Sequence, residues 1–128
     1  MIGTAPALLI CLAGGVGAAL RLVLDSFIRT RLKSTYPVGT TVINLTGSLL
    51  LGVLTGLTAG HLVPQQYQLI IGTGLLGGYT TFSAASFETV RLLEDRRYVA
   101  AAFHGLGMLI GCTAAAGFGY AVALLITS

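Results

Sequence analysis

Four long apolar runs separated by short polar breaks dominate the pattern of this chain. In this chain of 128 residues, the runs cover approximately residues 5–26, 38–60, 67–90 and 98–126. Each run reaches the roughly 20 residues that a helix needs to cross the hydrocarbon core of a bilayer. The breaks hold most of the charged residues and are too short for a soluble domain. The pattern predicts an all-α integral membrane protein with four transmembrane helices in one domain, residues 1–128.

The third run is interrupted, because three glycines and a series of hydroxyl side chains fall between Gly74 and Ser83. Backbone groups that leave a helix in hydrocarbon cost several kcal/mol each unless protein, water or an ion satisfies them. We therefore expect the third helix to be broken near residues 74–83 and to line an ion site.

A polar stripe marks the second helix. Thr40, Asn44 and Ser48 recur every four residues and so lie on one face. The Asn44 amide either bonds a neighbouring helix or, with the two hydroxyls, donates hydrogen bonds to an ion. Neutral donors suit a small, strongly hydrated anion, because they replace its water shell without trapping it.

Glycines at four-residue spacing predict where helices approach one another closely. They are Gly52, Gly56 and Gly60 on the second helix and Gly107 and Gly111 on the fourth. Such stripes let helix backbones pack together in lipid. We interpret them as packing surfaces.

A few charged or ionisable side chains remain within or near the apolar runs. Arg21 either extends to the membrane interface, or caps carbonyls of the broken helix and holds Asp25. Glu88 and Arg91, three residues apart, are expected to form an interfacial ion pair. His104 is either a pore-facing donor or, as we favour, part of a helix–helix bond.

Composition and charge set the membrane topology. Hydrophobic residues make up 55% and charged residues 9% of the chain, whereas soluble domains carry about 25% charged residues. We assign all seven Lys and Arg to the side of loops 27–37 and 91–97, and none to the other side. Because cationic loops stay in the cytoplasm, we expect a multi-pass plasma-membrane protein with both loops cytoplasmic and both termini outside. The net charge of +3 therefore reflects topology, not nucleic-acid binding.

Three segments carry motifs in a recognisable order. They are residues 14–21, rich in glycine and ending in Arg21; residues 37–48, which hold the polar stripe; and residues 77–83, followed by Glu88. Together they resemble the Fluc or CrcB family of small fluoride-specific channels, over nearly the whole chain. The resemblance implies passive, fluoride-selective export that lowers cytoplasmic fluoride, and no enzymatic activity.

The resemblance also implies an assembly and a set of site residues. In the family, two oppositely oriented subunits form an antiparallel dimer with two fluoride pores. A structural sodium ion at its centre is held by backbone carbonyls, which correspond here to Gly77 and Thr80. The motifs and the polar stripe give as pore or fluoride residues Asn44, Phe82, Thr40, Ser48, Thr81 and Ser83. An aromatic edge such as that of Phe82 is positive and attracts anions, although an isolated Phe in an apolar run is more often core.

Two positions depart from the family's pattern. Ala85 stands where a second pore phenylalanine is typical. On the fourth helix, aligning Gly111 with the family's glycine puts Phe103 and Gly107 where a hydroxyl and a tyrosine are frequent.

The charge bias bears on the partner and on competing functions. A chain with seven cationic residues on one side should insert in one orientation and pair with an oppositely oriented paralogue, with a homodimer as the alternative. A weakly conducting or non-conducting structural subunit of such a heterodimer is a second possible function. A small proton-coupled exporter is a third, but it needs a carboxylate early in the first helix, and none precedes Asp25.

Overall fold

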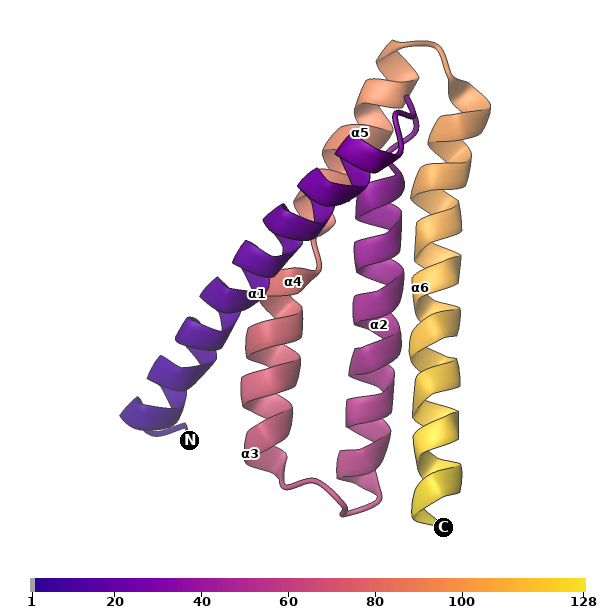
Figure 1. Cartoon of the computed structure of the whole chain (residues 1–128). Coiled ribbons are helices and arrows are strands. Elements are labelled where there is room, and N and C mark those ends of the chain that lie inside the picture. The colour runs from indigo at the N-terminus through magenta and orange to yellow at the C-terminus, as the bar shows by residue number, and fades with distance from the viewer. Residues whose placement is uncertain (1) are drawn as a thin grey trace.

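The computed structural model describes residues 2–128, and all its regular structure there is helical. The elements, in chain order, are α1 (Thr4–Arg31), α2 (Val38–Ala59), α3 (Gln65–Tyr67), η1 (Gln68–Leu76), α4 (Gly77–Tyr79), α5 (Phe82–Glu94) and α6 (Tyr98–Thr127). Three of these, α1, α2 and α6, are long and apolar enough to cross a membrane. The fourth crossing is made by α3 to α5, which together run the length of the bundle (Figure 1). The all-helical fold with a broken third crossing is as predicted.

The first helix is longer than the apolar run suggested. α1 ends at Arg31, where Leu32 turns to extended backbone with φ −112° and ψ 94°. Side chains on the last turns explain the extension, because Asp25 pairs with Arg29 at 3.1 Å and the Arg31 guanidinium lies 5.1 Å from the centre of the Phe27 ring. Pairs spaced by four residues stabilise a helix. As a result, Arg21 lies well inside α1 and is not a loop residue.

α2 is the central helix of the bundle and lies along α6, whereas α1 crosses the outside of the broken crossing diagonally (Figure 1). The predicted packing surface on α2 is confirmed. A Cβ added at Gly52 would collide with the Ala116 carbonyl, and one at Gly56 would lie 2.6 Å from Ala123 Cβ. On α6 the close approach uses Gly119, where an added Cβ would lie 2.5 Å from the Leu49 carbonyl oxygen.

The prediction that Gly107 and Gly111 form the packing surface of α6 was therefore only partly right. A Cβ at Gly111 would meet Leu45 Cδ2 at 3.1 Å, but at Gly107 it would meet only the Phe103 ring at 3.8 Å, in ordinary contact. The same small-residue packing joins α1 to the broken crossing, because the Gly14 carbonyl occupies the place that a Cβ of Gly78 would take. Helix backbones thus touch between α2 and α6 and between α1 and the broken crossing.

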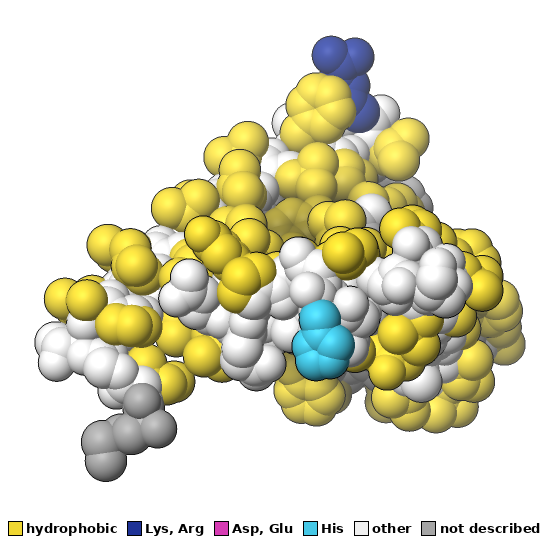
Figure 2. Space-filling model, turned by 90° about the horizontal axis from the view of Figure 1, so that it is seen from below, with side chains coloured by type: hydrophobic (Ala, Val, Ile, Leu, Met, Phe, Trp, Pro, Cys, Tyr) yellow, Lys and Arg dark blue, Asp and Glu magenta, His cyan; other side chains and the backbone are white. Residues whose placement is uncertain are grey.

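The two ends of the bundle differ in charge. The α1–α2 and α5–α6 connections lie at one end, and the α2–α3 connection lies at the other end with both termini (Figure 1). The first end carries Arg29, Arg31, Lys33, Arg91, Arg96 and Arg97. Seen from the end that carries the termini, the surface is mostly hydrophobic or uncharged, and dark blue appears only at the edge of the view (Figure 2). Since Arg21 lies inside α1, the bias is six cationic residues to none, not seven to none.

Candidate functional site

The break in the third crossing falls at two threonines. Thr80 has φ −79° and ψ 160° and Thr81 has φ −146° and ψ 124°, so both are extended. α5 then begins at Phe82, and the Thr81 hydroxyl caps it by accepting a hydrogen bond from the Ala84 amide at 3.1 Å. The break lies within the predicted 74–83 segment but is narrower, because Gly77 still has helical backbone, with φ −62° and ψ −40°. Before the break the chain forms the π-helix η1, a type frequent at functional sites.

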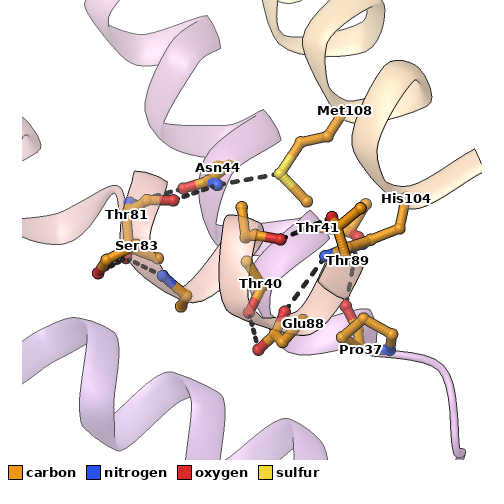
Figure 3. A network of polar contacts seen from close by, with 12 residues as sticks. Pro37, Thr40, Thr41, Asn44, Thr81, Ser83, Glu88, Thr89, His104 and Met108 are labelled. Carbon is orange, nitrogen blue, oxygen red and sulfur yellow. Dashed lines mark hydrogen bonds and ion pairs between the residues drawn. The ribbon is translucent and has the colours of Figure 1, made fainter. Parts of the chain in front are cut away.

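Asn44 of α2 holds the broken backbone in place. Its Nδ2 donates to the Thr81 carbonyl at 2.8 Å, and its Oδ1 accepts from the Thr81 amide at 2.8 Å. Nδ2 also donates to the Met108 sulfur at 3.0 Å, and the three residues form one row (Figure 3). Asn44 is only 8% exposed. It therefore makes the helix–helix bond that was one of its two expected roles.

The carbonyls around the break have lost their helical donors. In a continuous helix, the Gly77 carbonyl would accept from the Thr81 amide and the Thr80 carbonyl from the Ala84 amide. Both amides are diverted, to Asn44 Oδ1 and to the Thr81 hydroxyl. Freed carbonyls of this kind are natural ligands for a hard cation.

Arg21 supplies a cap for the same segment. Its Nε donates to the Gly78 carbonyl at 3.4 Å, which selects capping over extension to the interface. The part of the expectation that linked Arg21 to Asp25 was wrong, because Asp25 pairs with Arg29 near the end of α1. Arg21 thus positions the segment that holds Gly77 and Thr80.

A cavity of about 550 Å³ lies beside the break, between α2, α5 and α6. We call it the break cavity. It is lined by Asn44, Ser48, Thr80, Thr81, Phe82, Ala85, Ser86, Thr89, His104, Gly105, Met108, Leu109, Cys112 and Thr113. Hydroxyl and amide groups supply most of its polar atoms, and no Lys, Arg, Asp or Glu lines it within the described residues. Phe82 stands at its edge, 87% exposed in the protomer.

Four of the six predicted pore residues lie at the break cavity, and two do not. Asn44, Ser48, Thr81 and Phe82 meet at the break cavity, whereas Ser83 is exposed outside its lining, with its hydroxyl 3.3 Å from that of Thr81. Thr40 lines a second cavity of about 370 Å³ at the cationic end, which we call the loop-end cavity. The polar stripe of Thr40, Asn44 and Ser48 on α2 therefore contributes to both cavities. Positions four residues apart are not exactly in line on a helix, and Thr40 faces Glu88 of α5.

The face of α6 at the break cavity differs from the one inferred from the family alignment. Phe103 is 73% exposed and Gly107 is also exposed. The α6 residues that line the cavity are His104, Gly105, Met108, Leu109, Cys112 and Thr113, of which His104, Met108 and Cys112 lie one helical turn apart. Sequence reasoning missed Met108 and Cys112, although counting by four from His104 would have found both.

Glu88 lies at the meeting point of three elements. Its Oε1 accepts from the Thr40 hydroxyl at 2.8 Å, and its Oε2 lies 3.2 Å from His104 Nε2 (Figure 3). The expected pair between Glu88 and Arg91 was wrong, because Arg29 of α1 is the arginine within ion-pair distance, at 3.8 Å. His104 thus contacts α5 through Glu88, as the favoured helix–helix role expects, but it makes no hydrogen bond there and it also lines the break cavity, as the alternative role expects.

These features define a small multi-pass membrane protein with a cavity that holds neutral polar groups beside a broken crossing. The family described as "CrcB-like protein, Camphor Resistance (CrcB)" matches residues 8–120. The chain therefore belongs to the CrcB family.

Curated relatives carry channel names. The chain is 51% identical over 112 residues to "Fluoride-specific ion channel FluC 1" of Leifsonia xyli, a match that covers 88% of this chain and 82% of the relative. It is 46% identical over 114 residues to "Fluoride-specific ion channel FluC 2" of Cutibacterium acnes, covering 88% and 93%. To "Fluoride-specific ion channel FluC" of Anaeromyxobacter dehalogenans it is 36% identical over 120 residues, or 93% of each chain. The family is one of ion channels, not of enzymes.

Replacing Asn44 by alanine should destabilise the protein. The Thr81 amide and carbonyl would both lose their partner inside the membrane, at about 1–3 kcal/mol for each buried group. We expect Asn44→Ala to lower the temperature at which the detergent-solubilised protein loses helical circular dichroism, and Asn44→Asp to lower it as well, because a carboxylate oxygen would face the Thr81 carbonyl in place of a donor. Ser48→Ala, one turn further along α2, is the matched control. Equal stability of Asn44→Ala and Ser48→Ala would contradict the role of Asn44.

Proposed function

We propose that this chain is a subunit of a fluoride-selective channel in the plasma membrane, through which fluoride leaves the cell passively and its cytoplasmic concentration falls. The observation that carries the proposal is the break cavity, whose mostly apolar lining between α2, α5 and α6 holds hydroxyls and an amide but no Lys or Arg. The names of the relatives support the same ion.

The chemistry of the cavity fits a strongly hydrated anion. Ser48 and Asn44 offer neutral donors, which bind an anion reversibly. One Asn44 hydrogen is directed to the Met108 sulfur, and a thioether is a weak acceptor. A fluoride ion can therefore replace the sulfur as the acceptor of this hydrogen while the bonds between Asn44 and Thr81 remain. The exposed Phe82 adds an aromatic edge with positive character.

The competing functions have less support. A proton-coupled exporter would need a free carboxylate on the first crossing, but Asp25 is paired with Arg29 near the cationic end. A non-conducting subunit would not need hydroxyl and amide groups in a cavity beside the break. Ala85 lines that cavity, and we propose that a partner subunit supplies aromatic surface opposite it.

We further propose that the carbonyls of Gly77 and Thr80 hold a structural sodium ion. These two carbonyls have lost their helical donors, whereas those of Gly78 and Thr81 are taken up by Arg21 and Asn44. Gly77 is exposed on the protomer, so a second subunit related by a twofold axis can bring an equivalent pair to the same ion.

The partner that we propose is an oppositely oriented paralogue in an antiparallel dimer. The six cationic residues at one end favour a single orientation, with that end in the cytoplasm and both termini outside. Numbered names such as FluC 1 and FluC 2 among the relatives fit organisms that carry more than one such chain. A homodimer would need half of the copies to insert against their charge bias.

Liposomes that contain this chain, with its paralogue if one is required, should release fluoride far faster than chloride, by at least about tenfold, or about 1.4 kcal/mol in barrier. Ion-selective electrodes measure both fluxes. Asn44→Ala should reduce fluoride release, because the cavity loses its amide donor and its shape. Cys11→Ala, at an exposed position on α1, should leave it unchanged. Equal chloride and fluoride fluxes, or exchange of protons for an organic cation, would refute the proposed function.

Sodium should stabilise the assembly without being carried. Binding to the folded state alone raises stability by about 2.7 kcal/mol at a hundred times the dissociation constant. We therefore expect a higher melting temperature in sodium chloride than in N-methylglucamine chloride. Thr80→Ser should keep this difference, because the ligand is a main-chain oxygen and the hydroxyl bonded to the Leu76 carbonyl is retained. Uptake of radioactive sodium in proportion to fluoride, or melting that ignores sodium, would count against a structural ion.

A reporter fused after Ser128 should be found only outside the cell. The charge bias predicts this orientation, and moving the charge tests the cause. Arg91→Gln, Arg96→Gln and Arg97→Gln combined with Gln65→Lys and Gln66→Lys would leave three cationic residues against two and should yield both orientations. Fluoride release should also require co-expression of the paralogue. Both orientations in the unaltered chain, or full release by this chain alone, would exclude the obligatory heterodimer and leave the channel proposal standing.

A further inference from the structure

His104 is a fully buried side chain whose hydrogen-bonding capacity is not used. Its side chain is 0% exposed, and within the described residues Nδ1 has no hydrogen-bond partner. Nε2 lies 3.2 Å from Glu88 Oε2, but the two atoms do not meet the geometry of a hydrogen bond. A buried imidazole without a hydrogen-bond partner costs stability, and its presence therefore calls for an explanation.

The position of this pair is between the two cavities. His104 lines the break cavity, and Glu88 and Thr40 line the loop-end cavity. The three side chains therefore form the wall between them, with Glu88 between Thr40 and His104 (Figure 3). A route that joined the loop-end cavity to the break cavity directly would pass this wall.

The charged and titratable groups that face His104 can be named from every element around it. α5 contributes Glu88, and the α1–α2 connection contributes Tyr36, whose ring packs edge-on at 5.5 Å. α1 contributes Arg29, which reaches Glu88 at 3.8 Å and pairs with Asp25. α2 contains no titratable residue. Glu88 is thus the group through which a change of charge on His104 would act.

We propose that His104 is a positioning residue for Glu88, and that protonation of His104 fixes Glu88 in the wall and slows the passage of fluoride. This inference rests on the proposed function. The protonated imidazole donates from both ring nitrogens, so that Nε2–H and the Thr40 hydroxyl hold one carboxylate oxygen each. Charge-assisted bonds of this kind are about twice as strong as neutral ones.

The neutral state leaves the wall free to open. Glu88 then keeps its bond from Thr40 and its distant contact with Arg29. When the carboxylate turns away, the Thr40 hydroxyl becomes available to an anion, and the negative charge leaves the route between the cavities. Histidine is the side chain whose unperturbed charge change falls between about pH 5 and 8, so a change of pH is the condition that tests the device.

The pH dependence of fluoride release tests the proposal. Release from proteoliposomes, corrected for protein-free liposomes, is measured between about pH 5.5 and 8. We expect it to fall several-fold on acidification in the unaltered protein and to become nearly independent of pH in His104→Gln and in Glu88→Gln. His61→Asn is the control, since His61 is exposed in the α2–α3 connection at a positive φ of 63°, which Asn tolerates.

A second measurement does not depend on transport. The chain contains two histidines, and nuclear magnetic resonance of protein labelled at the imidazole Cε1 follows the titration of each. The midpoint for His104 should change in Glu88→Gln, whereas that for His61 should not. Size-exclusion chromatography at each pH checks that every variant remains folded.

The outcomes separate this inference from the proposed function. Absence of fluoride release at every pH in all proteins would refute the channel, and the resonance experiment would still decide whether Glu88 acts on His104. Release that is flat with pH, that rises on acidification, or that keeps its pH dependence in His104→Gln would refute the positioning role while the channel stands. A His104 titration that ignores Glu88→Gln would also overturn it.

Discussion

The exchange of two hydrogen bonds between Asn44 and the Thr81 backbone is the contact on which the rest of the structure depends. A membrane-spanning segment can leave the helical state only where another group satisfies its amides and carbonyls. Asn44 does so for the amide and carbonyl of one residue, at 2.8 Å in both directions. Asn44 diverts the Thr81 amide and the Thr81 hydroxyl diverts the Ala84 amide, which leaves the Gly77 and Thr80 carbonyls free of helical donors. The break and its proposed ion site therefore follow from one amide side chain on the neighbouring helix and one hydroxyl at the break itself.

Close packing of small residues brings the elements of the site together. The Gly14 carbonyl lies where a Cβ of Gly78 would be, and on the other side Gly47 leaves room for the methyl group of Thr80. Side chains between these backbones would separate α2 from the break and lengthen the bonds of Asn44. On α6, close packing of small residues such as Gly119 against α2 also brings the Met108 sulfur within 3.0 Å of Asn44 Nδ2. The glycines thus determine how closely the helices approach, and the polar side chains form hydrogen bonds across those short distances.

The sequence predicted the helical membrane fold and the interrupted third crossing, because apolar length and clustered glycines are local signals. It also indicated Asn44 as a helix-bonding group. It did not predict that Glu88 would face Thr40 and His104, since the rotation of one helix relative to another depends on packing that no single helix encodes. The same limit explains Phe103 and Gly107: a shift of one residue in the alignment turns a helix by about 100°, and the structure places His104 and Met108 at the cavity. Arg21 had two possible roles because the apolar run ends near residue 26, close to Arg21, whereas α1 continues to Arg31.

The order in which the partners of the break occur along the chain has a consequence for biosynthesis. Arg21 and Asn44 both precede the segment that they bind, Asn44 by 37 residues from Thr81. When the broken crossing leaves the ribosome and moves from the translocon into lipid, these partners already belong to inserted helices. Its exposed amides and carbonyls can thus be satisfied on arrival, without waiting for α6. Were the order reversed, the segment would have to enter hydrocarbon as a continuous helix and break afterwards. The arrangement therefore suits vectorial synthesis, and truncated nascent chains that end before α6 should already hold the kinked crossing in the membrane.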